Sequence, residues 1–270
     1  IRHGCGHNLI GVAAIGAGLA LAELLRATGT PGTVVVMGTP AEEGYGGKGQ
    51  MIAAGALTGI DAVMLAHPSG RTGPDRGSSA ITRFRIAFAG QSAHAAGAPD
   101  QARNALDGVM LTFAGINAWR QHLPEACRVH GIIDDGGAMA NIIPAHASCI
   151  IYLRAMEDEI LADMIRRLRA IAEGAALMTD TTAEVVAWGE SYRTRIPNAP
   201  LNEAWMAAAT ETGLDPVIPE RPPRASSDFG DVSHQVPGVH VYFGIAENEL
   251  AAHSPEFCAA AGTDFALDRM

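Results

Sequence analysis

Ala80-Ile81-Thr82-Arg83-Phe84-Arg85-Ile86-Ala87-Phe88-Ala89 alternates apolar and polar side chains over most of its length. Such alternation is typical of a strand with one buried face. The residues that follow predict two helices and three further strands. These elements are a helix over 101–121, strands over 128–134 and 147–154, an amphipathic helix over 158–177 and a strand over 182–188. The order β-α-β-β-α-β predicts a ferredoxin-like sandwich, which we assign to an inserted domain over 79–195.

Helices and strands alternate on both sides of this unit. We expect a mostly buried helix over Leu9 to Leu25 with Asn8 as its N-cap, because the run is almost uncharged. The remaining expected elements are strands over 32–38, 61–67 and 239–243 and helices over 50–56 and 201–212. This pattern predicts an α/β fold in which residues 1–78 and 196–270 form one discontinuous domain with a mixed sheet.

Composition excludes several classes of protein. The chain has 270 residues and a formal net charge of -10 without a Lys/Arg cluster, so we expect no nucleic-acid partner. Its four cysteines have no regular spacing, which indicates reduced thiols and a cytoplasmic location. The apolar helix contains Glu23 and several glycines, so we expect no membrane span.

Thiol, imidazole and carboxylate groups recur where predicted helices begin or strands end. Cys5 and His7 flank Gly6 before the first helix, while His67 and His253 lie in the predicted strand end and a later loop. A buried cysteine and a hydrogen-bonded loop histidine are the plain alternatives for each residue alone. Strand ends of an open α/β sheet share one edge, however, so together these residues favour a zinc-type metal site.

The adjacent residues Glu42 and Glu43 suggest two carboxylates with different roles. One carboxylate can bind a metal ion while the other accepts the proton of a water that the metal has made acidic. The alternative is a solvated acidic turn. The glycine-rich loop over 44–49 lacks the residue order of a phosphate-binding loop.

Six motifs occur in an order that resembles the di-metal aminoacylase/carboxypeptidase family, an amidohydrolase family with hippurate, auxin-conjugate and aminobenzoyl-glutamate hydrolases. Ser226 to Ser233 leans toward the aminobenzoyl-glutamate hydrolase branch, which includes dipeptidase-like members. Family members also carry segments before the first motif and after the last, so we expect the chain to be truncated at both ends and its catalytic sheet to lack strands. The motifs are Cys5-Gly6-His7-Asn8, Pro40-Ala41-Glu42-Glu43-Gly44, Leu65-Ala66-His67-Pro68, Gly90-Gln91-Ser92-Ala93-His94-Ala95-Ala96, Asn141-Ile142-Ile143-Pro144 and His253-Ser254-Pro255-Glu256-Phe257.

The resemblance implies a role for each motif residue. Glu42 is implied as the general base, and His94 as an oxyanion donor to the active site of a partner subunit. Asn141 and Arg154 are implied to lie near the substrate, with Arg154 as a carboxylate clamp or, equally, a surface charge. The implied ligands of two divalent ions, zinc or manganese, are Cys5, His7, Glu43, His67 and His253.

The implied reaction is cleavage of the amide bond in N-acyl amino acids, aminobenzoyl-glutamate-like conjugates or dipeptides. The inserted domain is implied to act as a lid and to form a homodimer. Two alternatives stay open at this point. The first is a metal-stabilised binding or scaffold protein without activity, and the second is a thiol hydrolase with Cys5 as nucleophile and His7 as base.

Overall fold

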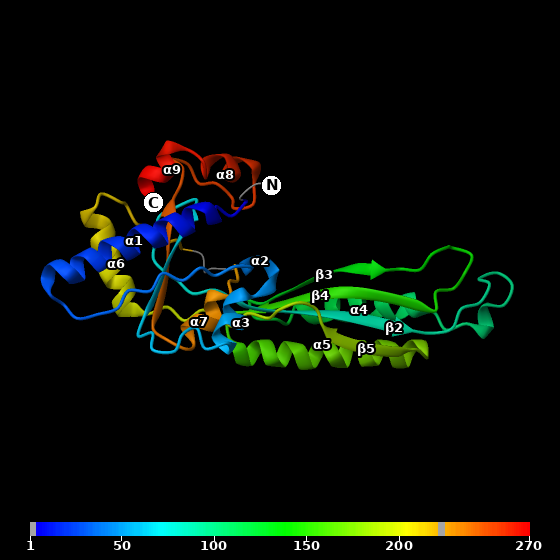
Figure 1. Ribbon diagram of the computed structural model, residues 1–270. Coiled ribbons are helices and arrows are strands. Elements are labelled where there is room, and N and C mark those ends of the chain that lie inside the picture. Colours follow the sequence, from blue (N-terminus) through cyan, green and yellow to red (C-terminus); the bar gives the residue numbers. More distant parts are fainter. Residues whose placement is uncertain (1–3, 221–224) are drawn as a thin grey trace.

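The computed structural model describes residues 4–220 and 225–270, and it places the strands in two separate sheets (Figure 1). The first is a parallel pair of β1 (Val63–Ser69) and β6 (Gly238–Gly244). The second is antiparallel in the order β3-β4-β2-β5. Its strands are β2 (Ala80–Ala89), β3 (Arg128–Asp135), β4 (His146–Ala155) and β5 (Thr182–Ala187).

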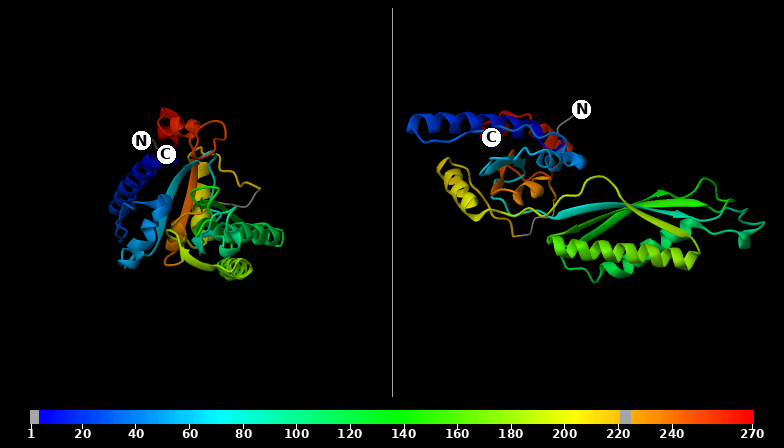
Figure 2. Two further views of the ribbon diagram at one scale, coloured as in Figure 1. Left: turned by 90° about the vertical axis from the view of Figure 1, so that its right-hand side faces the viewer. Right: turned by 60° about the horizontal axis from the view of Figure 1, so that its bottom comes forward.

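Two helices cover one face of the antiparallel sheet, as the right-hand view of Figure 2 shows. They are α4 (Ala105–Arg120) and α5 (Asp158–Thr179), so the predicted order β-α-β-β-α-β is present. Phe84, Ile86 and Phe88 of β2 are buried in one core with Val109 and Ile116 of α4. This alternation of buried and polar side chains along β2 is the one that the sequence predicted.

The start of α4 differs from the predicted boundary at residue 101. The Asn104 side chain accepts a hydrogen bond from the Leu106 N–H at 3.0 Å and caps the helix there. The preceding residues Pro99–Gln101 form a short 3-10 helix instead. The apolar spacing predicted the helix correctly but placed its start several residues before the capping residue.

The parallel pair belongs to a second region, which lies to one side of the antiparallel sheet (Figure 1). A small core of Leu9, Phe243, Ile245 and Phe257 joins the first helix to the end of β6 and to the C-terminal helices. The helices here are α1 (His7–Thr28), α2 (Glu42–Tyr45), α3 (Gly47–Ala53), α6 (Ala199–Glu211), α7 (Phe229–Ser233), α8 (Pro255–Ala260) and α9 (Asp264–Arg269). The α/β class is therefore confirmed, whereas the predicted mixed sheet is only a parallel pair within the described residues.

The first helix contradicts two predictions. Leu9 is its one buried residue among those described, so the expectation of a mostly buried helix is wrong for this chain. Asn8 is not the cap: the helix begins at His7 after Gly6, and the Asn8 side chain donates to the Ala261 carbonyl at 2.9 Å. An apolar run predicts a helix reliably, but burial depends on which elements pack against it.

Residues 32–38 are not a strand, although their valines predicted one. A strand needs a neighbour that completes its hydrogen bonds, and no described strand pairs with this segment. Val36 instead packs along α1, where a Cβ on Gly18 would lie 2.4 Å from Val36 Cγ2. Two further boundaries differ from the prediction. The predicted 44–49 loop contains the end of α2 and the start of α3, and the predicted 50–56 helix is α3, which ends at Ala53.

Two chain segments connect the regions and are bound to each other. Arg195 donates from Nε to Asp75 Oδ1 at 2.8 Å, and both side chains are fully buried. The Ile81 and Tyr192 backbones exchange two hydrogen bonds, at 2.9 and 3.0 Å. The root of β2 is thereby fixed against the return segment, close to the side chains that form the candidate site.

Candidate metal centre

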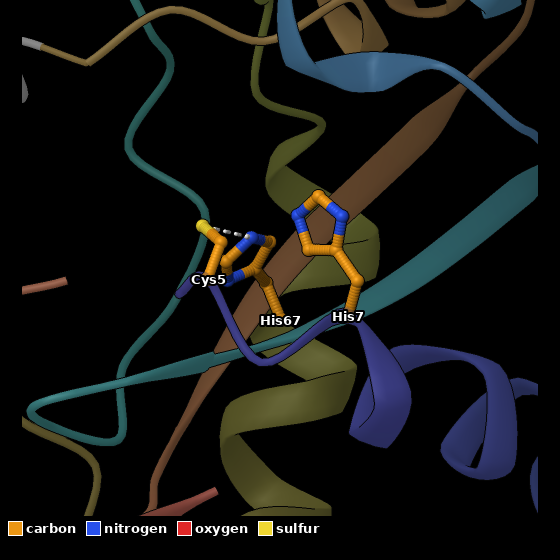
Figure 3. A group of neighbouring side chains, drawn as sticks. All are labelled: Cys5, His7 and His67. Atoms are coloured by element: carbon orange, nitrogen blue, oxygen red, sulfur yellow. Dashed lines mark hydrogen bonds between the residues drawn. The ribbon is translucent and has the colours of Figure 1, made fainter. Parts of the chain in front are cut away.

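Cys5 and His7 come together because Gly6 reverses the chain between them. Gly6 has φ 68°, a conformation that glycine adopts without strain, and a Cβ there would lie 2.6 Å from Pro68 Cγ. The turn directs both side chains toward His67, as Figure 3 shows. The ring centroids of His7 and His67 are 5.6 Å apart.

His67 lies within β1, two residues before its end. Its Nδ1 donates to the Pro68 carbonyl at 2.6 Å, because a carbonyl oxygen can only accept. The lone pair of the neutral ring is therefore on Nε2, which lies 3.6 Å from Cys5 Sγ. A backbone carbonyl that fixes the tautomer in this way is typical of metal-binding histidines.

Glu43 links these residues to the C-terminal loop. Its Oε1 lies 3.8 Å from His7 Nε2 and 4.0 Å from His253 Nε2. His253 has φ 66°, an uncommon conformation for a residue with a side chain, and its N–H donates to the Gly4 carbonyl at 2.8 Å. Segments from both ends of the chain thus meet at one carboxylate.

All five predicted ligands belong to one connected cluster, and so does Glu42. Three overlapping groups have ligand atoms within 4.8 Å of one another: Cys5 with His7 and His67, Cys5 with Glu43 and His253, and His7 with Glu42 and Glu43. Thiolate, imidazole and carboxylate are the ligand types of zinc, and the overlap provides enough donors for more than one ion. The residues present therefore fit a dinuclear site.

Burial and mutual repulsion shift the pKa values of the acidic groups in the cluster upward. Burial and the nearby Glu43 and Glu42 carboxylates raise the pKa of Cys5 to about 12. Burial, Asp228 and Glu43 likewise raise the pKa of Glu42 above its usual value. Burial lowers the pKa of His67 to about 4, so its ring is neutral at pH 7 and available as a ligand. A cation bound among these groups would lower the pKa values of Cys5 and Glu42, because it stabilises their ionised forms.

The same values argue against the thiol hydrolase. The imidazole nitrogen that lies 3.6 Å from the Cys5 sulfur belongs to His67. A thiolate–imidazolium pair needs a low thiol pKa and a basic ring, and the pKa of Cys5 is raised while that of His67 is lowered. The directions of these two shifts favour Cys5 as a metal ligand over Cys5 as the nucleophile of a thiol hydrolase.

Sequence reasoning missed a buried ion pair behind Glu42. Lys48 Nζ donates to Asp228 Oδ1 at 2.7 Å, and the Lys48 N–H donates to Asp228 Oδ2 at 3.1 Å. The Asp228 side chain is fully buried and that of Lys48 is 7% exposed. Ser227, the residue before Asp228, is placed so that its side chain lowers the pKa of Glu42. A lysine inside a glycine-rich loop was the available signal, but only tertiary structure pairs it with Asp228.

His94 and Asn141 lie together but away from the cluster. They belong to the segments 90–104 and 136–145, which form the tip of the antiparallel sheet in Figure 1, at the far end from α1 and α2. The Ala95 N–H donates to the Asn141 carbonyl at 2.9 Å, which ties the two segments together. His94 Nδ1 accepts from the N–H groups of Ala96 and Gly97 at 3.2 and 3.1 Å. The proton of its neutral ring is therefore on Nε2.

Arg154 lies at the opposite end of the same sheet, at the root that faces the first region. Its Nη1 donates to Ser226 Oγ at 2.9 Å, and Ser226 Oγ is 3.0 Å from Ser79 Oγ. Burial and the neighbouring Arg83 lower the pKa of Arg154. The two residues predicted to bind substrate, Asn141 and Arg154, are thus not neighbours within one chain.

Helix α1 is long and apolar enough to cross a membrane by length and composition. Its mean hydropathy is 1.8, and only 6% of its most apolar stretch is buried. His7 at its start joins the polar cluster, however, and Leu9 packs into the core with Phe257. The expectation that α1 does not span a membrane stays a prediction.

Comparisons with known proteins agree with this geometry. A sequence model of peptidase family M20/M25/M40 matches residues 1–264. The human Xaa-Arg dipeptidase is 37% identical over 97% of this chain and 62% of its own length. One of the two p-aminobenzoyl-glutamate hydrolase polypeptides of Escherichia coli is 38% identical over 78% of this chain and 44% of its own length. The chain therefore spans less than two thirds of each of these relatives.

Solved structures give the same fold. A putative aminohydrolase from methicillin-resistant Staphylococcus aureus superposes with a TM-score of 0.77, at 23% identity, over 96% of this chain and 72% of that one. A dinuclear metal-binding peptidase from Bacillus subtilis superposes with a TM-score of 0.69, at 24% identity, over 96% of this chain and 70% of that one.

Proposed function

The chain belongs to peptidase family M20/M25/M40, and on that premise we propose that it is a metal-dependent amidohydrolase. Its proposed substrates are dipeptides, N-acyl amino acids or aminobenzoyl-glutamate-like conjugates, in keeping with the activities for which its relatives are named. One observation carries the proposal. Five ligand-type side chains from residues 5 to 253 converge beside a carboxylate that can act as a base.

Two divalent ions would be held by Cys5, His7, Glu43, His67 and His253. When bound, such ions polarise an amide carbonyl and make water acidic near neutral pH. The cysteine and three histidines favour zinc, whereas the carboxylates also accept manganese. His67 supports the assignment because its Nδ1–H is already bound to a carbonyl, which leaves Nε2 for the metal.

Glu42 is the proposed general base. It accepts a proton from the attacking water and returns one to the departing amine. Burial and neighbouring carboxylates raise its pKa, which makes it a better proton acceptor than a solvated glutamate. Lys48 and Ser227 act in the opposite direction and lower the pKa of Glu42.

Arg154 is the proposed clamp for the carboxylate of the substrate. A guanidinium offers two parallel donors to a carboxylate, and Ser226 occupies only Nη1 among the contacts that involve described residues. Its position at the root of the antiparallel sheet, on the side of Ser226 and Ser227, brings it toward the same site as Glu42. Arg154 is also half-buried, whereas a plain surface charge would be exposed.

His94 and Asn141 would serve the site of a second copy of the chain. They cannot serve their own cluster in this conformation, because the tip of the sheet lies at the far end of the molecule (Figure 2). The Nε2–H of His94 would stabilise the oxyanion, since its Nδ1 is engaged by two backbone N–H groups. We accordingly propose a C2 homodimer formed through the region of the antiparallel sheet, with residues 79–195 as a lid domain.

The chain is further proposed to act in the cytoplasm. Its cysteines are unpaired, including the buried Cys127 and Cys149, which suits a reducing compartment.

The experiment is a hydrolysis panel of dipeptides, N-acyl amino acids and aminobenzoyl-glutamate, with zinc or manganese added after dialysis against chelator. We expect turnover only with metal, and a loss of about 10²- to 10⁴-fold in kcat for Glu42→Gln with unchanged metal content. Metal uptake without hydrolysis of any substrate would favour a binding protein. Hydrolysis that persists in chelator would contradict the proposal.

A further inference from the structure

The two carboxylates of the candidate site lie on a segment whose conformation regular helical hydrogen bonds do not hold. Glu42 and Glu43 belong to α2, but Glu43 has φ -70° and ψ 77°, and Gly44 has φ 91°, so the segment is a turn and not a regular helix. Ala41 before it adopts φ 62°, which is strained for a residue with a side chain. The direction of each carboxylate therefore depends on contacts from outside the turn.

Tyr192 provides such a contact on both sides of Glu43. Its hydroxyl donates to the Glu42 carbonyl at 2.8 Å and accepts from the Gly44 N–H at 3.1 Å. These two groups belong to the peptide units that enter and leave Glu43. A single hydroxyl thus holds the backbone of both the proposed base and a proposed metal ligand.

Tyr192 is itself held firmly. Its side chain is buried, and its backbone exchanges two hydrogen bonds with Ile81 at the root of β2. The Arg83 guanidinium carbon lies 5.3 Å from the centre of its ring. A Cβ on Gly46 would lie 3.1 Å from Tyr192 Cε1, so the turn packs closely against the ring.

We propose that Tyr192 is a positioning residue that orients the Glu42–Glu43 turn and thereby sets metal affinity and turnover. Both of its hydrogen bonds to the turn go to backbone groups, so it acts through the backbone of the residues that carry the ligand atoms. Partners of this kind, one step removed from a metal, change affinity or activity by about 10- to 100-fold when they are removed. The inference rests on the proposed function, because it assumes that Glu43 binds metal.

The test compares Tyr192→Phe, which removes only the hydroxyl, with Tyr45→Phe. Tyr45 lies in the same turn, but its side chain is exposed and makes none of these contacts. Zinc affinity would be measured by competition with a chromogenic chelator, together with kcat and KM for a substrate that the wild type hydrolyses. We expect zinc affinity and kcat to fall about 10- to 100-fold in Tyr192→Phe, with KM within about twofold and Tyr45→Phe like the wild type.

Wild-type zinc affinity in folded Tyr192→Phe would overturn the inference, whatever happens to its thermal midpoint, because a purely structural tyrosine would change only the midpoint. If that variant does not fold in buffer, the same zinc competition is run on it and on the wild type in sucrose, which favours the compact state; equal affinities there would likewise overturn the inference. Failure of the proposed function is a different result: the wild type itself would bind no zinc or would hydrolyse nothing.

Discussion

Lys48→Met should destabilise the protein strongly, because it leaves the Asp228 carboxylate buried without its counter-charge. Lys48 Nζ lies 2.7 Å from Asp228 Oδ1, and of the two hydrogen bonds between these described residues the one from the Lys48 N–H at 3.1 Å would remain. Removing one partner of a buried ion pair costs about 3–5 kcal/mol. Because Lys48 is slightly exposed and the backbone bond persists, we expect about 3 kcal/mol, near the lower end of that range.

Urea denaturation of the metal-free protein, followed by circular dichroism, would measure this loss. For a chain of this size, about 3 kcal/mol corresponds to a thermal midpoint lower by roughly 6–12 °C. The matched control is Arg71→Met, which breaks an exposed pair with Glu249 and should cost less than about 1 kcal/mol. Adding Asp228→Asn to Lys48→Met should restore at least half of the loss. If the free energy of unfolding of Lys48→Met lies within about 1 kcal/mol of the wild-type value, Lys48 and Asp228 do not form a buried ion pair.

Three further outcomes are expected. Cys5→Ser should lower zinc affinity in a competition assay, and unchanged affinity would remove the thiolate from the ligand set. Asp158→Asn should lower the free energy of unfolding by about 1 kcal/mol at pH 7, because Asp158 accepts hydrogen bonds from Arg193 and Thr194. Burial raises the pKa of Asp158, but these hydrogen bonds outweigh burial and lower the pKa below its usual 3.8. The Asp158 contribution is then present above about pH 4 and lost as the pH falls through the lowered pKa, so the denaturation curves of the two proteins should converge in acid. His94→Ala should abolish turnover while the protein keeps its metal. Mixing equal amounts of His94→Ala and Glu42→Gln subunits should restore roughly a quarter of the wild-type activity, because about half of the dimers are mixed and each mixed C2 dimer has one complete site. No recovery on mixing would contradict the proposal that His94 serves the site of the partner subunit.

The antiparallel region was predicted well because its pattern is local. Strand β2 alternates buried and polar residues, and its apolar residues meet the apolar faces of α4 and α5. Each element carries its own periodicity, so the order β-α-β-β-α-β could be derived without tertiary information. The boundary error at α4 arose because a single capping residue, Asn104, outweighs the apolar spacing before it.

Predictions for the first region were less successful because they assumed neighbours. Residues 32–38 have a strand-like composition, but a strand also needs a hydrogen-bonding partner, and none of the described strands provides one. The same applies to α1, whose apolar side chains include the largely exposed Leu19. Composition indicates what a segment can bury, and the fold decides what covers it.

The sequence predicted which residues of ligand type would lie together, but it did not predict the residues that hold them in place. Cys5, His7, Glu43, His67 and His253 were predicted together because metal-binding residue types recur in motifs of recognisable order, and the structure brings them together. Lys48, Asp228 and Tyr192 were missed, since each acts through a partner about 150 residues or more away in sequence. The roles of the five ligands, of Glu42 as base, and of His94, Asn141 and Arg154 stay predictions.

Crystals grown with zinc and measured at the zinc absorption edge test the central claim most directly. The account predicts two anomalous peaks about 2.0–2.3 Å from ligand atoms of Cys5, the three histidines and Glu43. Peaks elsewhere, or a zinc-loaded protein with His67 or His253 turned away from Cys5, would contradict it.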